Sequence, residues 1–320
     1  MKISILIPIK LQYNEKNLSD FVNHIASLAV ALKEDDCQIV IADESNCKVY
    51  RYINNKLKFF NNVKHFIPSE DLRTGDNDKL NGIYAGLNYV IYDKVLLIDD
   101  HYRITRETLA KISKYFDEYD CFKMMPKFDK FPFTVLIDMC GMFIINILDR
   151  RKQYCGHLAF RKEHISKTGF PNRDGLFDEF ILEEKLRNSG YSIGFVKDAS
   201  LEATQDIPFN KFLEQRVRYA YENLAMPFRF TLYALVLPII LLLLIISPKV
   251  AGLFCITITI IVLLLACIGQ ILYGAKILPF FTFLLSPLWF WFYPFTTWIA
   301  VWKYYSGGVK FGGKKVRKAK

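Results

Sequence analysis

Residues 95–101 read VLLIDDH, in which four apolar residues are followed at once by two carboxylates and an imidazole. A similar run, QIVIA at 38–42, ends at Asp43. Two further strand-like runs lie at 3–7 and 63–67, and segments with apolar residues at helical spacing separate them, for example 21–32 and 79–91. Strands that alternate with helices predict an α/β fold with a mainly parallel sheet covered by helices on both faces.

The carboxyl ends of such strands are where open α/β sheets bind their ligands, and Asp43 and Asp99 both lie there. Asp99 and His101 are alternate residues, so their side chains point to the same side. A divalent cation on a diphosphate needs one or two hard protein ligands, and an imidazole among them favours Mn²⁺ over Mg²⁺. A solvated turn is the commoner explanation of one acidic strand end. The sequence contains neither GxGxxG nor GxxxxGK[ST], so dinucleotide and P-loop sites lack support.

The charge of the chain is divided unevenly along its length. The 320 residues include 42 basic and 32 acidic ones, and all ten basic residues beyond Glu222 lie in a C-terminal third that has no acidic residue. Residues 1–222 therefore carry no net formal charge, while the excess of +10 belongs to the hydrophobic part. A nucleic-acid-binding domain should carry its basic patch on the folded domain itself, so this distribution argues against nucleic acid as a partner.

Three apolar segments, 230–246, 250–273 and 277–302, close the chain. A helix needs about 20 apolar residues to cross a bilayer. The third segment holds three prolines and all four tryptophans, which favours an interfacial position. Because basic residues flank the set on both sides, the positive-inside rule predicts two spans with a cytoplasmic catalytic domain. A fourth apolar run, 131–148, is compatible with either the membrane interface or ordinary core packing.

Several motifs occur in an order that resembles the membrane-associated, inverting nucleotide-sugar glycosyltransferases of family two, in particular the branch that includes ceramide glucosyltransferase. The matching segments are Pro8 with Asn14-Glu15, Asp43-Glu44-Ser45, Asn77-x-Lys79-x-Asn81, Asp99-Asp100-His101 in place of Asp-x-Asp, the pair Asp178-Glu179, and Gln215-x-x-Arg218-Tyr219 in place of Gln-x-x-Arg-Trp. The resemblance covers most of residues 1–225.

The resemblance implies a GT-A-type nucleotide-sugar-binding domain over 1–225, a membrane domain over 226–304 and a basic tail over 305–320. It assigns roles to individual residues. Glu179 is the expected general base, with Asp178 as the alternative. Asp99 and His101 are the expected ligands of Mn²⁺ or Mg²⁺. The expected contacts of the donor are Pro8, Glu15, Asp43, Lys79, Asp99 and Asp100, and those of the acceptor or diphosphate are Gln215, Arg218 and Tyr219. The last segment also reads as a basic amphipathic helix on anionic lipid, with Lys211, Arg216 and Arg229 as its cations.

These observations together predict an integral membrane glycosyltransferase that transfers a sugar from a nucleotide-sugar, with UDP as the expected nucleotide, to a lipid acceptor at the cytoplasmic face. A processive polysaccharide synthase is the first alternative, because Gln-x-x-Arg-aromatic motifs are frequent in those enzymes. A catalytically inactive membrane scaffold of the same fold is the second, because His101, Glu179 and Tyr219 depart from the usual pattern.

Overall fold

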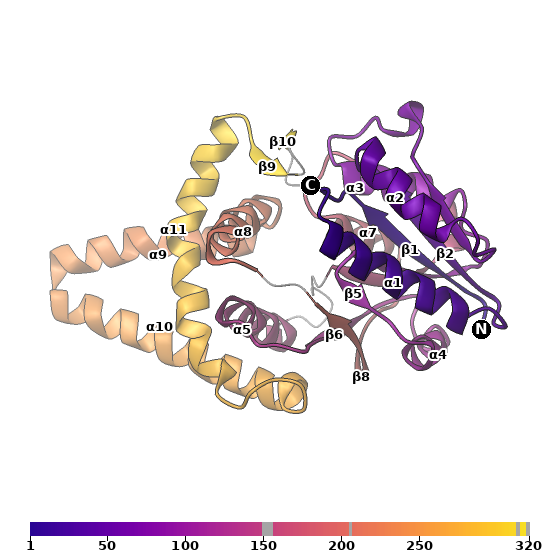
Figure 1. Ribbon diagram of the computed structural model, residues 1–320. Coiled ribbons are helices and arrows are strands. Elements are labelled where there is room, and N and C mark those ends of the chain that lie inside the picture. The colour runs from indigo at the N-terminus through magenta and orange to yellow at the C-terminus, as the bar shows by residue number, and fades with distance from the viewer. Residues whose placement is uncertain (149–155, 205–206, 312–313, 318–320) are drawn as a thin grey trace. The chain divides into compact units, whose positions relative to one another are not determined.

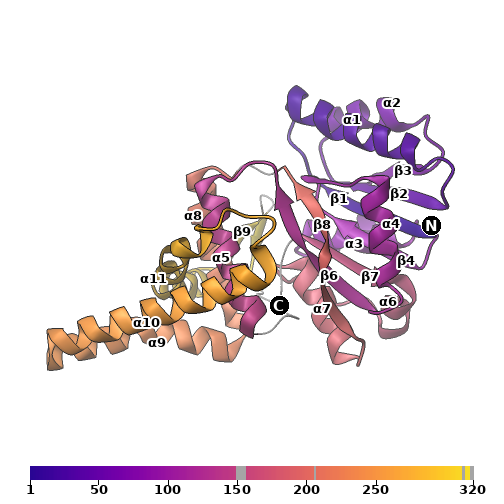
Figure 2. The same ribbon diagram turned by 90° about the horizontal axis from the view of Figure 1, so that it is seen from below.

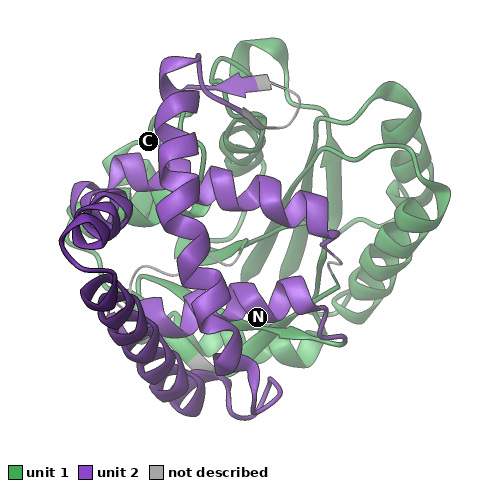
Figure 3. Cartoon of the chain, turned by 90° about the vertical axis from the view of Figure 1, so that its left-hand side faces the viewer, with its two compact units in different colours: residues 1–129, 154–205 green, residues 130–153, 206–320 purple. Residues whose placement is uncertain are grey.

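The computed structural model describes residues 1–148, 156–204, 207–311 and 314–317. Two compact units make up the chain (Figure 3): unit 1 comprises residues 1–129 and 154–205, and unit 2 comprises residues 130–153 and 206–320. This division differs from the boundary expected at residue 225, because residues 133–148 and 209–222 form helices that pack with the C-terminal helices. Residues 312–313 and 318–320 of the expected basic tail lie outside the described part.

Unit 1 contains an eight-stranded sheet, and its labelled strands can be followed in Figures 1 and 2. Four neighbouring pairs of strands are parallel and three are antiparallel, so the expected mainly parallel sheet is confirmed. In spatial order the strands are β3 (Val63–Phe66), β2 (Cys37–Asp43), β1 (Ile3–Ile9), β4 (Lys94–Ile98), β7 (His157–Arg161), β6 (Cys121–Phe128), β8 (Ile193–Ala203) and β5 (Tyr102–Arg103).

Helices cover both faces of this sheet. The helices of unit 1 are α1 (Glu15–Ala31), α2 (Cys47–Leu57), α3 (Asp78–Leu87), α4 (Arg106–Tyr115), α6 (Lys162–Thr168) and α7 (Asp178–Asn188), with a 3₁₀ turn at Glu70–Leu72. Side-chain oxygens of Asn14, Asn77 and Thr105 accept hydrogen bonds from the first turns of α1, α3 and α4, which fixes where these helices begin. The helix expected over 79–91 ends earlier, at Leu87, because the chain turns there towards β4.

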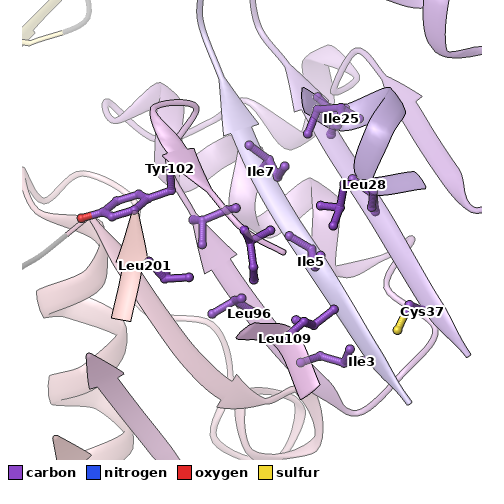
Figure 4. Packing of buried hydrophobic residues seen from close by; sticks show 14 of the residues in the cluster. Ile3, Ile5, Ile7, Ile25, Leu28, Cys37, Leu96, Tyr102, Leu109 and Leu201 are labelled. Carbon is purple, nitrogen blue, oxygen red and sulfur yellow. The ribbon is translucent and has the colours of Figure 1, made fainter. Parts of the chain in front are cut away.

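The core explains why the central strands are apolar on both sides. Along β1, Ile3, Ile5 and Ile7 belong to the cluster that includes Ile25 and Leu28 of α1 (Figure 4). Side chains of the alternate residues point to the opposite face. There Leu6 lies so close to Gly86 of α3 that a Cβ on Gly86 would collide with it. The sheet is therefore buried on both faces, as parallel sheets generally are.

Unit 2 is built almost wholly from helices. Its elements are α5 (Phe133–Leu148), α8 (Phe209–Glu222), a 3₁₀ turn (Asn223–Ala225), α9 (Pro227–Ile246), α10 (Pro248–Gly269), a π turn (Gln270–Gly274), a 3₁₀ turn (Thr282–Leu285), α11 (Ser286–Tyr305), β9 (Val309–Phe311) and β10 (Lys314–Val316). α11 packs on α5, α8 and α9, and α10 packs on α5. Most of the apolar run 131–148 thus forms a helix, α5, whose side chains are mostly buried within this unit.

Helices α9 and α10 form a hairpin joined by Ser247 alone (Figures 1 and 2). The apolar helical segments are 20 and 27 residues long, or about 30 and 40 Å at 1.5 Å per residue. In the most apolar window of each segment, only 11% and 17% of the residues are buried within the protein. Both helices are therefore long enough and apolar enough to cross a bilayer. The third apolar segment behaves differently, since Trp289, Phe290 and Tyr293 of α11 are buried within unit 2.

Candidate active site

Lys79 lies at the centre of the carboxylates that the sequence singled out in unit 1. Its Nζ atom is 2.5 Å from Asp99 Oδ1, 2.7 Å from Asp178 Oδ2 and 2.8 Å from Glu179 Oε1. The four residues come from three places: the first turn of α3, the residue after β4, and the first turn of α7. Since the side chain of Lys79 remains 19% exposed, the cluster is accessible at the carboxyl end of β4.

Hydrogen bonds between two loops bring α3 and α7 together. Asn77 caps α3 by accepting from the amide of Leu80 (3.2 Å), and its Nδ2 donates to the carbonyl oxygens of Gly175 (2.8 Å) and Leu176 (3.2 Å). Gly175 and Leu176 lead directly into α7, which begins at Asp178. One asparagine side chain therefore fixes both helix starts, and with them Lys79 and the two acids.

Arg173 and Asn81 brace the same pair of loops. The guanidinium of Arg173 donates to the carbonyl of Leu72 and to Thr74 Oγ1, both at 2.5 Å. The side chain of Asn81 accepts from the amide of Gly75 (3.0 Å) and donates to its carbonyl (2.8 Å). These contacts leave no room for a larger residue at Gly75, where a Cβ would overlap Arg173.

Asp99 is held against the first residue before β7. Its amide donates to the carbonyl of Gly156 at 3.1 Å. Gly156 has a φ of 71°, and a Cβ placed there would lie 2.9 Å from Asp99 Oδ2. Only glycine suits that backbone conformation while leaving space for the carboxylate. Gly156 thus leaves the space that the Asp99 carboxylate needs at the end of β4.

The pKa values of the neighbouring acids Asp178 and Glu179 are shifted in opposite directions. Burial raises the pKa of Asp178 well above its usual value, and the charge of Glu179 adds to this effect. Burial also acts to raise the pKa of Glu179, but Lys79 and hydrogen bonds outweigh it and hold that pKa below the usual value. The pKa of Asp99 is raised, mainly by burial. Glu179 is therefore the carboxylate of the α7 pair that ionises more readily, as a general base must.

The charge of Lys79 is maintained by the same neighbours. Burial disfavours the ammonium, and the positive end of α3 does so too. Nevertheless Asp178, Asp99 and Glu179 raise the pKa of Lys79 well above its usual value. In the other direction, the first turn of α7 favours the negative charges of Asp178 and Glu179. The cluster is thus a set of mutually dependent charges.

Asp100 and His101 lie in the turn that follows Asp99. The Nδ1 atom of His101 is 3.7 Å from Asp100 Oδ1, and although burial acts to raise the pKa of Asp100, its interaction with His101 lowers it. Within the described residues, no group of three or more His, Cys, Asp and Glu side chains surrounds a possible metal position. Asp99 Oδ1 is nevertheless buried and has no hydrogen bond of regular geometry, although Lys79 Nζ lies beside it. One carboxylate and one imidazole fit a cation whose other ligands are diphosphate oxygens and water.

Asp43 lies at the end of β2 with both carboxylate oxygens engaged. Oδ1 accepts from the amide of Ser45 (2.8 Å), and Oδ2 is 2.9 Å from Nε2 of His65, which stacks on Tyr50 with the ring centroids 4.5 Å apart. Asp43 is completely buried. In this structure it shapes the loop after β2, and Ser45 Oγ in turn accepts from the amide of Leu11 (2.8 Å).

The two remaining donor candidates of unit 1 lie near the end of β1. Pro8 is buried in β1 opposite Ala42, beyond the last residue of β1 that pairs with β4, so its missing N–H breaks no bond to that strand. Glu15 is exposed at the start of α1. Its place next to the N-cap Asn14 suits a negative charge. Among the described residues, neither forms a hydrogen bond or an ion pair with the Lys79 cluster.

The Gln-x-x-Arg-Tyr segment lies on α8 of unit 2. Gln215 is buried, and its Oε1 has no hydrogen-bond partner within the described residues. Arg218 and Tyr219 are partly buried, and burial raises the pKa of Tyr219. The three residues belong to one stretch of helix, as their spacing predicts.

Arg216 does not fit the alternative interpretation of this segment as a basic helix on anionic lipid. Its side chain is 1% exposed and forms an ion pair with Asp138 of α5. The guanidinium also lies 4.6 Å from the ring of Phe212 and 4.7 Å from that of Tyr219. Arg216 therefore fixes α8 against α5. A lone aspartate in the apolar run 131–148 was the sequence signal that such a partner exists.

Comparisons with known proteins place this architecture. No protein-family profile and no curated protein matches the chain. Among solved structures, the mannosyltransferase PcManGT from Pyrobaculum calidifontis, determined with GDP-Man and Mn²⁺, matches over 97% of this chain and 76% of its own, with a TM-score of 0.52 and 15% identity. The protein has a GT-A fold.

Two further GT-A neighbours match over a smaller part of the chain. TarS residues 1–349 from S. aureus match over 67% of this chain with a TM-score of 0.45 and 18% identity, and the chain spans 64% of the length of that fragment. Glucosyl-3-phosphoglycerate synthase from Mycobacterium tuberculosis, determined with Mn²⁺, UDP and glucosyl-3-phosphoglycerate, covers 66% of this chain and 74% of its own, with a TM-score of 0.46 and 12% identity.

Proposed function

We propose that this protein is a membrane-bound, inverting glycosyltransferase that transfers a sugar from a nucleotide-sugar to a lipid acceptor. The observation that carries the proposal is the Lys79 cluster, in which a strand-end carboxylate and a pair of helix-start carboxylates share one ammonium. The GT-A fold supports the donor class, since the solved mannosyltransferase of this fold is bound to GDP-Man and Mn²⁺. The branch that includes ceramide glucosyltransferase is our preferred comparison within it.

In this proposal Asp99 and His101 hold the divalent cation, Mn²⁺ in preference to Mg²⁺. When bound, the cation offsets the negative charge that develops on the departing diphosphate. Asp99 presents its carboxylate at the end of β4, fixed by the contact with Gly156. Asp100 holds the imidazole of His101 in place. The chain thus supplies two ligands in one turn and leaves the remaining positions to the donor.

Glu179 acts as the general base. An inverting transfer needs a carboxylate to take the proton from the acceptor hydroxyl as its oxygen attacks the anomeric carbon. Glu179 accepts a hydrogen bond from Lys79 Nζ and has a lowered pKa, so it is ionised at neutral pH. Asp178 has a raised pKa, so it ionises less readily than Glu179 and is less suited to take the proton. Asp178 remains the alternative base.

The donor nucleoside binds at the ends of β1 and β2. The loop after β2 is held rigid by the contacts of Asp43 with Ser45 and His65, which gives a flat base or ribose a fixed edge to bind. Pro8, Glu15, Lys79 and Asp100 complete the proposed donor set. UDP-sugars are the first donors to test, followed by GDP-sugars.

The acceptor is a lipid that reaches the enzyme through unit 2. Helices α9 and α10 are two apolar segments that would cross the bilayer and return the chain to the cytoplasmic side. Gln215, Arg218 and Tyr219 on α8 are the proposed contacts to the acceptor or the diphosphate. A guanidinium is suited to the oxygens of a diphosphate, and a tyrosine ring to a sugar or lipid surface.

A donor screen tests the proposal. Full-length protein in detergent or native membranes is incubated with labelled UDP- and GDP-sugars, Mn²⁺ and a lipid extract, and nucleotide release and lipid-soluble label are measured. Glu179→Gln serves as the inactive control. Transfer of single sugars to lipid is the expected result, while long products on a gel would indicate a processive synthase. Neither transfer nor hydrolysis with any donor, together with absence of metal-dependent nucleotide binding, would indicate an inactive scaffold.

A further inference from the structure

The ammonium of Lys79 lies 2.5 Å from Oδ1 of Asp99, one of the two carboxylate oxygens that a divalent cation could coordinate. We propose that Lys79 makes cation binding depend on the nucleotide: without donor its ammonium takes the place of the metal beside Asp99, and it moves to the incoming diphosphate when the metal enters. This inference rests on the proposed function and adds an order of binding to it. Lys79 is then a positioning residue that couples the metal side of the site to the base side.

The contacts of Lys79 show why the two cations compete. A lysine ammonium has three N–H donors, and three carboxylates from Asp99, Asp178 and Glu179 lie within 2.8 Å of Nζ. A metal ion that coordinates Asp99 would come within a few ångströms of this ammonium. Two positive charges at that distance repel strongly in a partly buried site. The metal therefore displaces Lys79 from Asp99 or does not bind there.

The charges explain what the nucleotide contributes. With all four groups ionised, three carboxylates and one ammonium leave two negative charges, which one divalent cation would balance. Moving Lys79 away from all three carboxylates without a replacement partner would nevertheless leave a buried ammonium unpaired, which is costly. A diphosphate supplies new anionic oxygens for the ammonium. Metal and diphosphate are thus expected to enter together, each making the other's place available.

The backbone allows this exchange without refolding. Asn77 and Asn81 fix the first turn of α3 on either side of Lys79. Only the four-carbon side chain of Lys79 has to move, while Glu179 and Asp178 stay in place at the start of α7. After the exchange Lys79 binds the diphosphate and no longer donates to Glu179. Donor binding therefore frees the Glu179 carboxylate to accept the proton of the acceptor hydroxyl.

The experiment measures Mn²⁺ uptake by the full-length protein in detergent, by electron paramagnetic resonance of the free ion, without nucleotide and with UDP or GDP. We expect wild type to bind Mn²⁺ at least about 10-fold more tightly with nucleotide, and Lys79→Met to bind it without nucleotide about 10- to 100-fold more tightly than wild type. Lys79→Arg keeps the charge and should retain the nucleotide dependence. Lys111→Met, which removes an exposed lysine of α4, should match wild type.

The outcomes separate the inference from the proposed function. Equal Mn²⁺ affinity with and without nucleotide in wild type overturns the inference and leaves the transferase proposal intact. The same holds if Lys79→Met binds Mn²⁺ no more tightly than wild type. If Mn²⁺ is not taken up even with nucleotide, the metal-dependent transferase proposal fails together with the inference. If Lys79→Met does not fold, the wild-type comparison and Lys79→Arg decide, since loss of nucleotide dependence in Lys79→Arg would overturn the inference.

Discussion

The side-chain amide of Asn77 donates to the carbonyl oxygen of Gly175 at 2.8 Å, across 98 residues of sequence. This bond and the cap that Asn77 forms on α3 place Lys79 beside Asp178 and Glu179. Arg173 supports the same two loops through its contacts with Leu72 and Thr74. The candidate site therefore depends on one buried amide as much as on its charged groups.

Replacing Asn77 by alanine removes the cap and leaves two buried carbonyls without a donor. The free energy of unfolding should fall by about 2–4 kcal/mol, and nucleotide binding should weaken because Lys79 loses its position. Thermal unfolding and calorimetric nucleotide binding in detergent measure the two effects. Asn88→Ala, at an exposed position at the end of the same helix, is the matched control. Equal losses of stability and nucleotide binding in both variants would show that Asn77 does not hold the starts of α3 and α7 together.

Glu179→Gln keeps the shape of the side chain but cannot accept a proton at neutral pH. Because general base catalysis contributes about 10²–10⁴-fold, transfer should fall by that factor, while donor binding should change little. Asp178→Asn should have a smaller effect, since its raised pKa makes Asp178 the acid of the pair that ionises less readily. Transfer rates and donor affinities of the two variants are compared directly. A larger loss of transfer activity in Asp178→Asn would assign the role of general base to Asp178. Small losses in both variants would exclude both residues from that role.

Asp99→Asn removes the anionic ligand proposed for the divalent cation. A neutral amide coordinates Mn²⁺ more weakly, so transfer should be abolished and metal-dependent donor binding should weaken strongly. Titration of nucleotide with and without Mn²⁺ separates this effect from general damage, because metal-independent binding should persist. Normal activity of Asp99→Asn would remove this residue from the site.

His24 should make unit 1 sensitive to mild acid. Its Nε2 accepts from the amide of Ile104 at 3.3 Å, which requires the neutral ring. Burial, aided by the charge of Arg103, lowers the pKa of His24 from 6.5 to about 4. Unfolding then takes up a proton between these values, so stability falls as the pH drops from 6.5 towards 4. His24→Gln should show a smaller fall in melting temperature over this range. Parallel curves for the two proteins would contradict the assignment.

The membrane arrangement can be tested with thiol labelling. If α9 and α10 are the two crossings, Cys47 of unit 1 and a thiol introduced by Lys315→Cys should both react with an impermeant maleimide from the same side of sealed vesicles. Both positions are exposed in the structure. A third crossing by α11 would place the two thiols on opposite sides. The protein should also stay in the membrane pellet at alkaline pH.

Much of the architecture follows from local sequence patterns. Continuous apolar runs predicted the central strands β1, β2 and β4, because a strand that is buried on both faces has no solvent-exposed positions for polar side chains. Carboxylates directly after such runs predicted a ligand-binding edge of the sheet, and the order of motifs predicted the GT-A fold. The apolar C-terminal segments, the prolines and tryptophans of the third and the basic residues that flank the set predicted two membrane spans and a third segment of another kind; two helices are long and apolar enough to cross a bilayer.

Only the tertiary structure shows which charged side chains pair with residues from distant segments of the chain. Lys79, Asp99 and Glu179 were each singled out, but nothing in their local sequence says that one ammonium would join all three. The assignment of Arg216 to the lipid surface failed for the same reason, since its partner Asp138 lies on another helix. Periodicity reports which face a residue occupies, whereas burial of a charge depends on a counter-charge brought by a distant segment. Sequence therefore determined the elements of this protein, and the long-range pairing of buried charges determined its site.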